Sequence, residues 1–133
     1  MENTYRHTKT AVSLLNYHFV FCPRYRRKIF DIPGVEDRFK ELVSQLCAKY
    51  DIEIIAMECD RDHAHLFLGC PPTLSPAEVM AHIKGPTSRI LRDEFEALSR
   101  MTHLWTRSYF AATVGSVSNE TIKRYVESQK RVR

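Results

Sequence analysis

The fold of this chain is decided by the stretch Ile52-Glu53-Ile54-Ile55-Ala56-Met57-Glu58-Cys59-Asp60-Arg61-Asp62-His63-Ala64-His65-Leu66-Phe67-Leu68-Gly69. It holds two runs of apolar and β-branched residues, 52–59 and 63–69, which are typical of buried strands. Only Asp60, Arg61 and Asp62 separate the two runs. So short a polar break predicts an antiparallel hairpin.

The segments before this hairpin predict one strand and one helix. Residues 1–12 are polar, and we expect them to be loose. Residues 14–21 are aromatic and apolar, which predicts a buried strand. Residues 24–28 form a basic loop. A helix is predicted over 35–49, because apolar residues recur there at helical spacing: Phe39, Leu42, Val43 and Leu46.

The segments after the hairpin predict a helix, a strand and a last helix. Ser75 can cap a helix that begins at Pro76. We expect this helix to be interrupted or bent near Gly85-Pro86 and to resume through Leu98. A fourth strand is predicted over 109–114. Ser118 can cap a last helix, which runs from Asn119 to about Lys130.

The order of these elements predicts the fold class. Strand, helix, strand, strand, helix and strand follow one another, which is the ferredoxin-like split β-α-β pattern. We therefore expect an α+β protein with a four-stranded antiparallel sheet and two helices on one face. An extra C-terminal helix then lies near the other face. At 133 residues the chain is long enough for one domain, 1–133, with its own core.

Composition limits the class of protein and its surroundings. The formal net charge is +4, which is compatible with nucleic acid and also with simple solubility. The four cysteines form no C-x-x-C pair, so a zinc knuckle is not expected and a reducing compartment is favoured: Cys22, Cys47, Cys59 and Cys70. No apolar run approaches the ~20 residues of a membrane span, so we expect a cytoplasmic protein.

The two histidines of the hairpin are a candidate metal site. Side chains alternate along a strand, so His63 and His65 share one face, about 7 Å apart at their α-carbons. Two imidazoles at this spacing can converge on one ion, but they need a third ligand. The alternative interpretation is two histidines on a solvated sheet face.

Tyr125 and Gln129 are a second candidate pair. They are four residues apart and therefore lie on the same side of the predicted last helix. The amide oxygen of a glutamine is a plausible ligand for a hard cation such as Mg²⁺ or Mn²⁺, and a poor one for zinc. The alternative interpretation is a half-buried anchor beside a solvated glutamine.

Two groups of basic residues are candidates for DNA binding. Arginine and lysine near an aromatic ring suit phosphate contact and base stacking. The alternative is an ordinary charged surface. The first group surrounds Tyr25 in the loop, and the second lies near the Gly85-Pro86 bend: Arg24, Arg26, Arg27 and Lys28; Lys84, Arg89 and Arg92.

The ordered set of these motifs resembles the small HUH transposases with a single catalytic tyrosine, which move insertion sequences as single-stranded DNA. The resemblance covers nearly the whole chain. Its motifs are Tyr17-His18-Phe19-Val20-Phe21-Cys22-Pro23-Arg24-Tyr25-Arg26-Arg27, Asp62-His63-Ala64-His65-Leu66, Lys84-Gly85-Pro86-Thr87-Ser88-Arg89-Ile90-Leu91-Arg92, Trp105, Ser108-Tyr109-Phe110, Thr113-Val114-Gly115, and Tyr125 to Gln129.

The resemblance implies specific chemistry. His63, His65 and Gln129 would hold Mg²⁺ or Mn²⁺, and Tyr125 would be the nucleophile that forms a 5′-phosphotyrosine and releases a 3′-hydroxyl. The expected substrate is single-stranded DNA with hairpin ends, cleaved and rejoined at insertion-sequence ends. A homodimer is also implied, in which a hinge at Gly115 could let the last helix complete its own or the partner's site.

Other functions remain open on the sequence. A non-catalytic ferredoxin-like nucleic-acid-binding module is one alternative, although the glycine-aromatic signature of RNA-recognition domains is missing. A relaxase or replication initiator shares the same residue logic, but those proteins are usually larger. A domesticated relative that processes repetitive genomic hairpins has the same sequence pattern as a transposon's enzyme.

Overall fold

A four-stranded antiparallel sheet forms the centre of the computed structural model, which describes residues 5–113 and 119–129. Its order is β4-β5-β3-β6, with the first and third strands of the split β-α-β pattern in the middle. The strands are β3 (Asn16–Phe21), β4 (Glu53–Asp60), β5 (His63–Gly69) and β6 (Phe110–Thr113). The predicted α+β fold is therefore confirmed.

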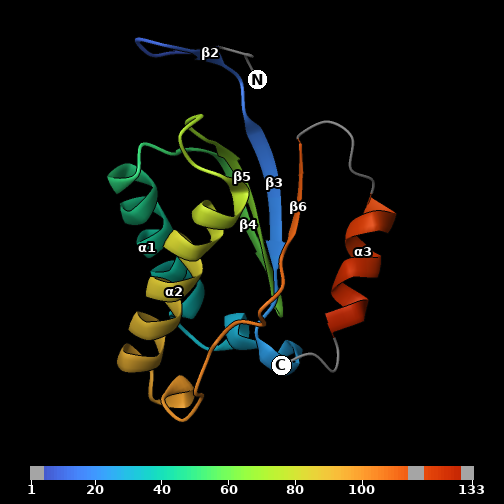
Figure 1. Ribbon diagram of the computed structural model, residues 1–133. Helices are drawn as coiled ribbons and strands as arrows, with labels where there is room; N and C mark the ends of the chain where they lie inside the picture. Colours follow the sequence, from blue (N-terminus) through green and yellow to red (C-terminus); the bar gives the residue numbers. More distant parts are fainter. Residues whose placement is uncertain (1–4, 114–118, 130–133) are drawn as a thin grey trace.

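The helices lie on both faces of the sheet. α1 (Val35–Lys49) and α2 (Pro76–Glu94) cover one face, and α3 (Asn119–Ser128) lies on the other side, next to β6 and β3 in the view of Figure 1. Two helices on one face and an extra C-terminal helix near the other were both expected from the order of elements.

The main core lies between the sheet and the helix pair. Phe19 and Phe21 of β3 alternate with His18 and Val20, so that the phenyl rings face α1 and α2 and the other two side chains face α3. Leu66 of β5 is completely buried on the same side as the phenyl rings. A smaller cluster under α3 contains Val20, Cys22, Phe110, Tyr125 and Val126.

The pairing of β4 with β5 fixes which side chains share the α3 face. Asp60 lies opposite His63 and Glu58 lies opposite His65. Directly opposite residues point to the same face of a sheet. The hairpin therefore places two carboxylates beside the two histidines.

α2 differs from its prediction, because it runs without interruption from Pro76 to Glu94. The expected interruption at Gly85-Pro86 is therefore wrong. A proline disfavours helical conformation in the residue before it by contact with that residue's Cβ, and Gly85 has none. The helix then ends at Glu94, four residues before the predicted end, and Leu98 belongs to a short 3₁₀ turn, η3 (Glu96–Leu98).

The N-terminal region also differs from its prediction. Part of it forms a small hairpin of β1 (Arg6–His7) and β2 (Val12–Ser13), and Arg6 forms an ion pair of 2.8 Å with Asp51. Strand β3 begins at Asn16, two residues later than expected. Two 3₁₀ turns, η1 (Arg24–Arg26) and η2 (Ile29–Asp31), lie within the segment between β3 and α1.

Several predicted features lie outside the described residues: the end of the fourth strand at Val114, the hinge at Gly115, the cap at Ser118 and the helix end at Lys130. Within the described part of the chain, no helix combines the length and the apolar character that crossing a membrane requires.

Candidate active site

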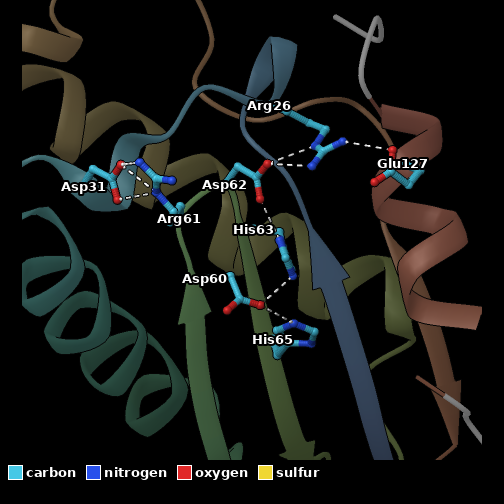
Figure 2. Close-up of polar contacts among 8 residues, drawn as sticks. All are labelled: Arg26, Asp31, Asp60, Arg61, Asp62, His63, His65 and Glu127. Carbon is cyan, nitrogen blue, oxygen red and sulfur yellow. Dashed lines mark hydrogen bonds and ion pairs between the residues drawn. The ribbon is translucent and has the colours of Figure 1, made fainter. Parts of the chain in front are cut away.

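Three side chains from one hairpin meet on the sheet face under α3. The ligand atoms of Asp60, His63 and His65 all lie within 4.8 Å of one another. The Oδ2 of Asp60 lies 2.8 Å from the Nε2 of His63 and 3.5 Å from the Nε2 of His65. Both imidazoles therefore direct the same ring nitrogen toward one carboxylate oxygen, as Figure 2 shows.

His63 is held between two carboxylates. Its Nδ1 lies 2.9 Å from the Oδ1 of Asp62, and its Nε2 faces Asp60. A neutral imidazole has one N–H and can donate to only one of these acceptors. If that N–H points to Asp62, the bare Nε2 and the Asp60 carboxylate face each other, and a cation between them satisfies both.

Arg26 connects this hairpin to α3. Its guanidinium lies 2.9 Å from Asp62 and 3.6 Å from Glu127, so a continuous chain of polar contacts runs from Glu127 to His65 (Figure 2). Tyr25 and Arg26 adopt positive φ angles of 61° and 50°. Residues other than glycine rarely adopt this backbone conformation. Here it turns the Arg26 side chain inward while Tyr25 stays exposed.

A third histidine supports the pair from β3. The Nε2 of His18 lies 3.2 Å from the Nδ1 of His65, and the His18 ring stacks on Phe67 with 4.0 Å between centroids. Burial, followed by the charge of His65, lowers the pKa of His18 to about 4, so the ring is neutral at pH 7. A neutral His18 can accept the Nδ1 proton of His65, which leaves the Nε2 of His65 bare.

These donors fit a divalent cation. When both imidazoles carry their proton on Nδ1, two bare Nε2 atoms and one carboxylate oxygen converge, and each imidazole has a hydrogen-bond partner on its other nitrogen. Metal-ligating histidines in proteins almost always have such partners. Imidazole and carboxylate together suit Mn²⁺, and the carboxylate suits Mg²⁺.

Tyr125 and Gln129 lie together, on the side of α3 that faces Ser108. The Ser108 Oγ lies 3.0 Å from the Tyr125 phenol and donates to the Gln129 Oε1 over 2.9 Å. Serine has one proton and the amide oxygen only accepts, so the phenol must donate to Ser108. Burial raises the pKa of Tyr125 to about 12, against the opposing effect of the Ser108 hydrogen bond. The phenol is therefore protonated at neutral pH.

A cavity of about 450 Å³ lies between α3 and the histidine cluster. The described residues of α3 that line this cavity are Lys123, Val126 and Glu127. The fold thus brings α3 over the histidine face as expected, while Tyr125 and Gln129 themselves point to Ser108. The described carboxylate beside both histidines is that of Asp60, whereas the amide oxygen of Gln129 accepts from Ser108.

The predicted basic residues lie in different surroundings in the structure. Arg26 is paired as described, and the guanidinium of Arg27 lies 5.7 Å from the centroid of the Tyr25 ring. Lys28 and Arg89 are exposed. The remaining three residues, one from the loop and two from α2, line a single cavity on the helix side of the sheet: Arg24, Lys84 and Arg92.

Sequence reasoning missed four residues of this region. Asp60 was interpreted only as a turn residue, and Asp62 was given no role at the metal although it begins the motif that holds both histidines. The alternation of β3 could have placed His18 on the same face. Ser108 was quoted in a motif without a role, because its role depends on a contact with a helix that begins eleven residues later.

Comparison of the sequence with known proteins gives consistent matches. The sequence profile of a family described as "Transposase IS200 like" matches residues 11–129. The transposase for insertion sequence element IS200 of Salmonella typhimurium is 34% identical over 117 residues, which cover 85% of this chain and 75% of that protein. The ISDra2 transposase TnpA of Deinococcus radiodurans is 30% identical over 118 residues, which cover 86% and 84%.

Two solved structures are similar to this one. A crystal structure described as a transposase from Deinococcus radiodurans has a TM-score of 0.86 and 26% identity, and covers 93% of this chain and 97% of that one. A REP-associated tyrosine transposase bound to a REP hairpin has a TM-score of 0.59 and 11% identity, and covers 92% and 67%. The second match shows a common fold alone.

Proposed function

This chain belongs to the family of IS200-like transposases, and we propose that it cleaves and rejoins single-stranded DNA at insertion-sequence ends with Tyr125 as the nucleophile. The observation that carries the proposal is the arrangement of one sheet face. A cluster of two histidines and a carboxylate lies under a helix whose tyrosine and glutamine form one hydrogen-bonded unit.

We propose that His63 and His65 hold Mg²⁺ or Mn²⁺ through their Nε2 atoms. Asp60 is the oxygen donor in the present position of α3, and Gln129 joins when α3 moves toward the cluster. The chemistry that a bound ion supplies there is Lewis-acid stabilisation of charge on a phosphoryl oxygen. Asp62 and His18 orient the two imidazoles by binding their Nδ1 atoms.

The role of Tyr125 is covalent catalysis. Its phenol gives up its proton as the oxygen attacks the scissile phosphorus, a 5′-phosphotyrosine bond forms, the bond from phosphorus to the 3′-oxygen breaks, and the 3′-oxygen takes up a proton. A free 3′-hydroxyl later attacks the phosphotyrosine and releases the phenol, so the bond energy is conserved and no nucleotide cofactor is consumed. This route agrees with a site built from a single tyrosine and a metal-ligand cluster.

The reaction requires α3 to change position. In the present arrangement the phenol donates to Ser108, and its pKa is raised to about 12, which disfavours the nucleophilic phenolate. We propose that Tyr125 and Gln129 leave Ser108 together and turn toward His63 and His65 of the same chain or of a partner in a homodimer. Gly115, outside the described residues, is the proposed hinge.

One gel tests this function. Purified protein is incubated with a labelled single-stranded DNA hairpin that carries unpaired flanks, with Mg²⁺ or Mn²⁺ and with a chelator. We expect a covalent protein–DNA species and a free 3′-hydroxyl fragment only when the metal is present. The same sequence as a full duplex is the control. Equal cutting of duplex, or adduct formation in chelator, contradicts the proposal.

A further inference from the structure

A second cavity, of about 500 Å³, lies on the helix side of the sheet, between α2 and the segment 103–109. Its wall on α2 carries small residues, Ala77, Ala81 and Gly85, and a Cβ built on Gly85 meets nothing within 4 Å. The volume is that of a site for one small ligand. The fold creates this cavity from three separate segments, since Arg24 comes from the loop after β3.

The lining of this cavity is strongly basic. No acidic residue belongs to it, whereas five basic side chains do: Arg24, Lys84, Arg92, His103 and Arg107. In the described part of the chain none of these five forms an ion pair with a carboxylate. The Nε of Arg24 is buried and has no hydrogen-bond partner there. Three guanidinium groups and an ammonium group thus share one small volume without a counter-charge.

The polar contacts that these side chains do make are all to neutral groups. Arg92 donates to the carbonyl oxygens of Ser88 and Met101. Lys84 donates to the carbonyl oxygens of Thr106 and Ser108, each over 2.8 Å. These hydrogen bonds fix the positions of Arg92 and Lys84 and leave the charge of both side chains uncompensated. Such preorganised cations favour an anion with several acceptor oxygens.

This cavity is connected to Tyr125 through Ser108. Ser108 binds Lys84 through its carbonyl oxygen and the Tyr125 phenol through its hydroxyl. The cavity and the phenol therefore lie on two sides of one residue. A DNA strand whose phosphates enter the cavity passes close to the point from which Tyr125 is released.

From this geometry we infer that the basic cavity binds phosphate groups of the unpaired strand that flanks the scissile phosphate. The inference rests on the proposed function, because it takes single-stranded DNA as the substrate. The cavity is too small for the face of a duplex, so its occupant is a nucleotide or two of an unpaired strand. The cavity thereby fixes the strand, while the histidine cluster acts on the phosphate that is cut.

The test compares a charged and a neutral variant at one position. Ala81 is exposed in the middle of α2, where glutamate and glutamine are both good helix formers. Ala81→Glu places a negative charge at the cavity wall, and Ala81→Gln has nearly the same shape without the charge. Binding is measured by fluorescence anisotropy in chelator, so that no cleavage occurs, with a bare DNA hairpin and with the same hairpin carrying an unpaired flank.

We expect Ala81→Glu to weaken binding of the flanked hairpin by about tenfold relative to Ala81→Gln, because one like charge lies beside the bound phosphate. Binding of the bare hairpin should be the same for both variants. Replacing Arg24 and Arg107 together by glutamine should reduce the slope of log K against log salt by about 1.4 for the flanked DNA, which is about 0.7 for each lost phosphate contact.

Three results overturn the inference: equal binding of flanked DNA by the two Ala81 variants, an equal loss for the bare and the flanked hairpin, or a flank that adds no affinity to the wild-type protein. Thermal melting of both variants checks that α2 is intact. If α2 fails to fold, Arg107→Gln, in an exposed loop, gives the same comparison. A wild-type protein that shows the expected binding but never cuts DNA contradicts the proposed function alone.

Discussion

The hydroxyl of Ser108 lies 3.0 Å from the phenol of Tyr125, and the same hydroxyl donates to the amide oxygen of Gln129. One serine therefore binds both functional candidates of α3. Lys84 in turn donates to the Ser108 carbonyl oxygen. Ser108 belongs to the Ser108-Tyr109-Phe110 motif, but nothing in the sequence assigns it this contact with α3.

Ser108→Ala should loosen α3 without removing any group proposed to react. Two hydrogen bonds are lost, and we expect a loss of about 1–2 kcal/mol in unfolding free energy. Hydrogen exchange of the α3 amides, followed by mass spectrometry, should become faster. Cleavage of hairpin DNA should persist at the wild-type rate or above it. The control is Ser99→Ala, which removes an exposed local hydrogen bond to Glu96. Unchanged exchange in α3 contradicts the proposed role of Ser108.

Tyr125→Phe should abolish the covalent protein–DNA species and leave DNA binding intact. The change removes only the hydroxyl, so the ring packing against Phe110 remains. Denaturing gels with labelled DNA report the adduct, and anisotropy reports binding. Tyr50→Phe is the matched control, because Tyr50 stacks on His82 at the end of α1, away from both cavities. If Tyr125→Phe forms the adduct at the normal rate, another residue is the nucleophile.

Asp60→Asn and Gln129→Ala should separate two stages of metal binding. In the free protein Gln129 is bonded to Ser108, so Gln129→Ala should leave Mn²⁺ affinity unchanged in a calorimetric titration without DNA. Asp60→Asn should weaken that affinity by about tenfold or more, because it removes the carboxylate charge beside both imidazoles. Cleavage should be reduced by both substitutions. The opposite order of Mn²⁺ affinities means that Gln129 is a ligand before DNA binds.

His18→Phe tests whether the contact of His18 with the Nδ1 of His65 contributes to metal binding. Phenylalanine keeps a ring that stacks on Phe67 but cannot bind the Nδ1 of His65. Loss of such a partner of a metal ligand typically costs about 10–100-fold in metal affinity, and we expect a reduction in that range for Mn²⁺. Circular dichroism should remain that of the wild type. Full Mn²⁺ affinity in a folded His18→Phe protein shows that His65 needs no such partner.

Lys84 should make stability depend on pH in the alkaline range. Burial lowers its pKa from the ordinary value of 10.5 to about 8. Between pH 8 and 10.5 the unfolded chain holds a proton on Lys84 that the folded protein has lost, so this residue makes stability rise with pH across that window and contributes no slope below it.

The measurement is the difference in melting temperature between the wild type and Lys84→Met from pH 7 to 10.5. Buried thiols such as Cys22 have a raised pKa, which lowers stability above pH 9. Both proteins contain these thiols, so subtracting one melting temperature from the other removes most of their effect. We expect the wild type to gain relative to Lys84→Met as the pH rises. A flat difference means that Lys84 is not desolvated in the folded protein.

Much of the fold could be read from local patterns. The helix over 35–49 and the strand over 63–69 were predicted with the bounds that the structure shows. The spacing of apolar residues along each of them indicates which side is buried. Two exceptions were the N-terminal hairpin of β1 and β2, in a region expected to be loose, and α2. Gly85-Pro86 is a common break signal, but a glycine before the proline and packing along the whole helix allow it to continue.

The site was only partly predictable. The H-x-H spacing places His63 and His65 on one face whatever the rest of the chain does, because strand side chains alternate. The identity of the oxygen donor beside them depends on the register of β4 against β5, which brings Asp60 to His63. The sequence pattern pointed to Gln129 for that role, and its assignment stays a prediction.

The sequence by itself determined the order of the elements, the pairing of two imidazoles on one face, and the common side of Tyr125 and Gln129, because each depends on residues no more than a few positions apart. Only the tertiary structure decided which way the tyrosine side of α3 faces and which basic residues meet. Arg24 and Arg107 are 83 positions apart and share one cavity. Contacts over such separations follow from how the layers pack, and no local pattern records them.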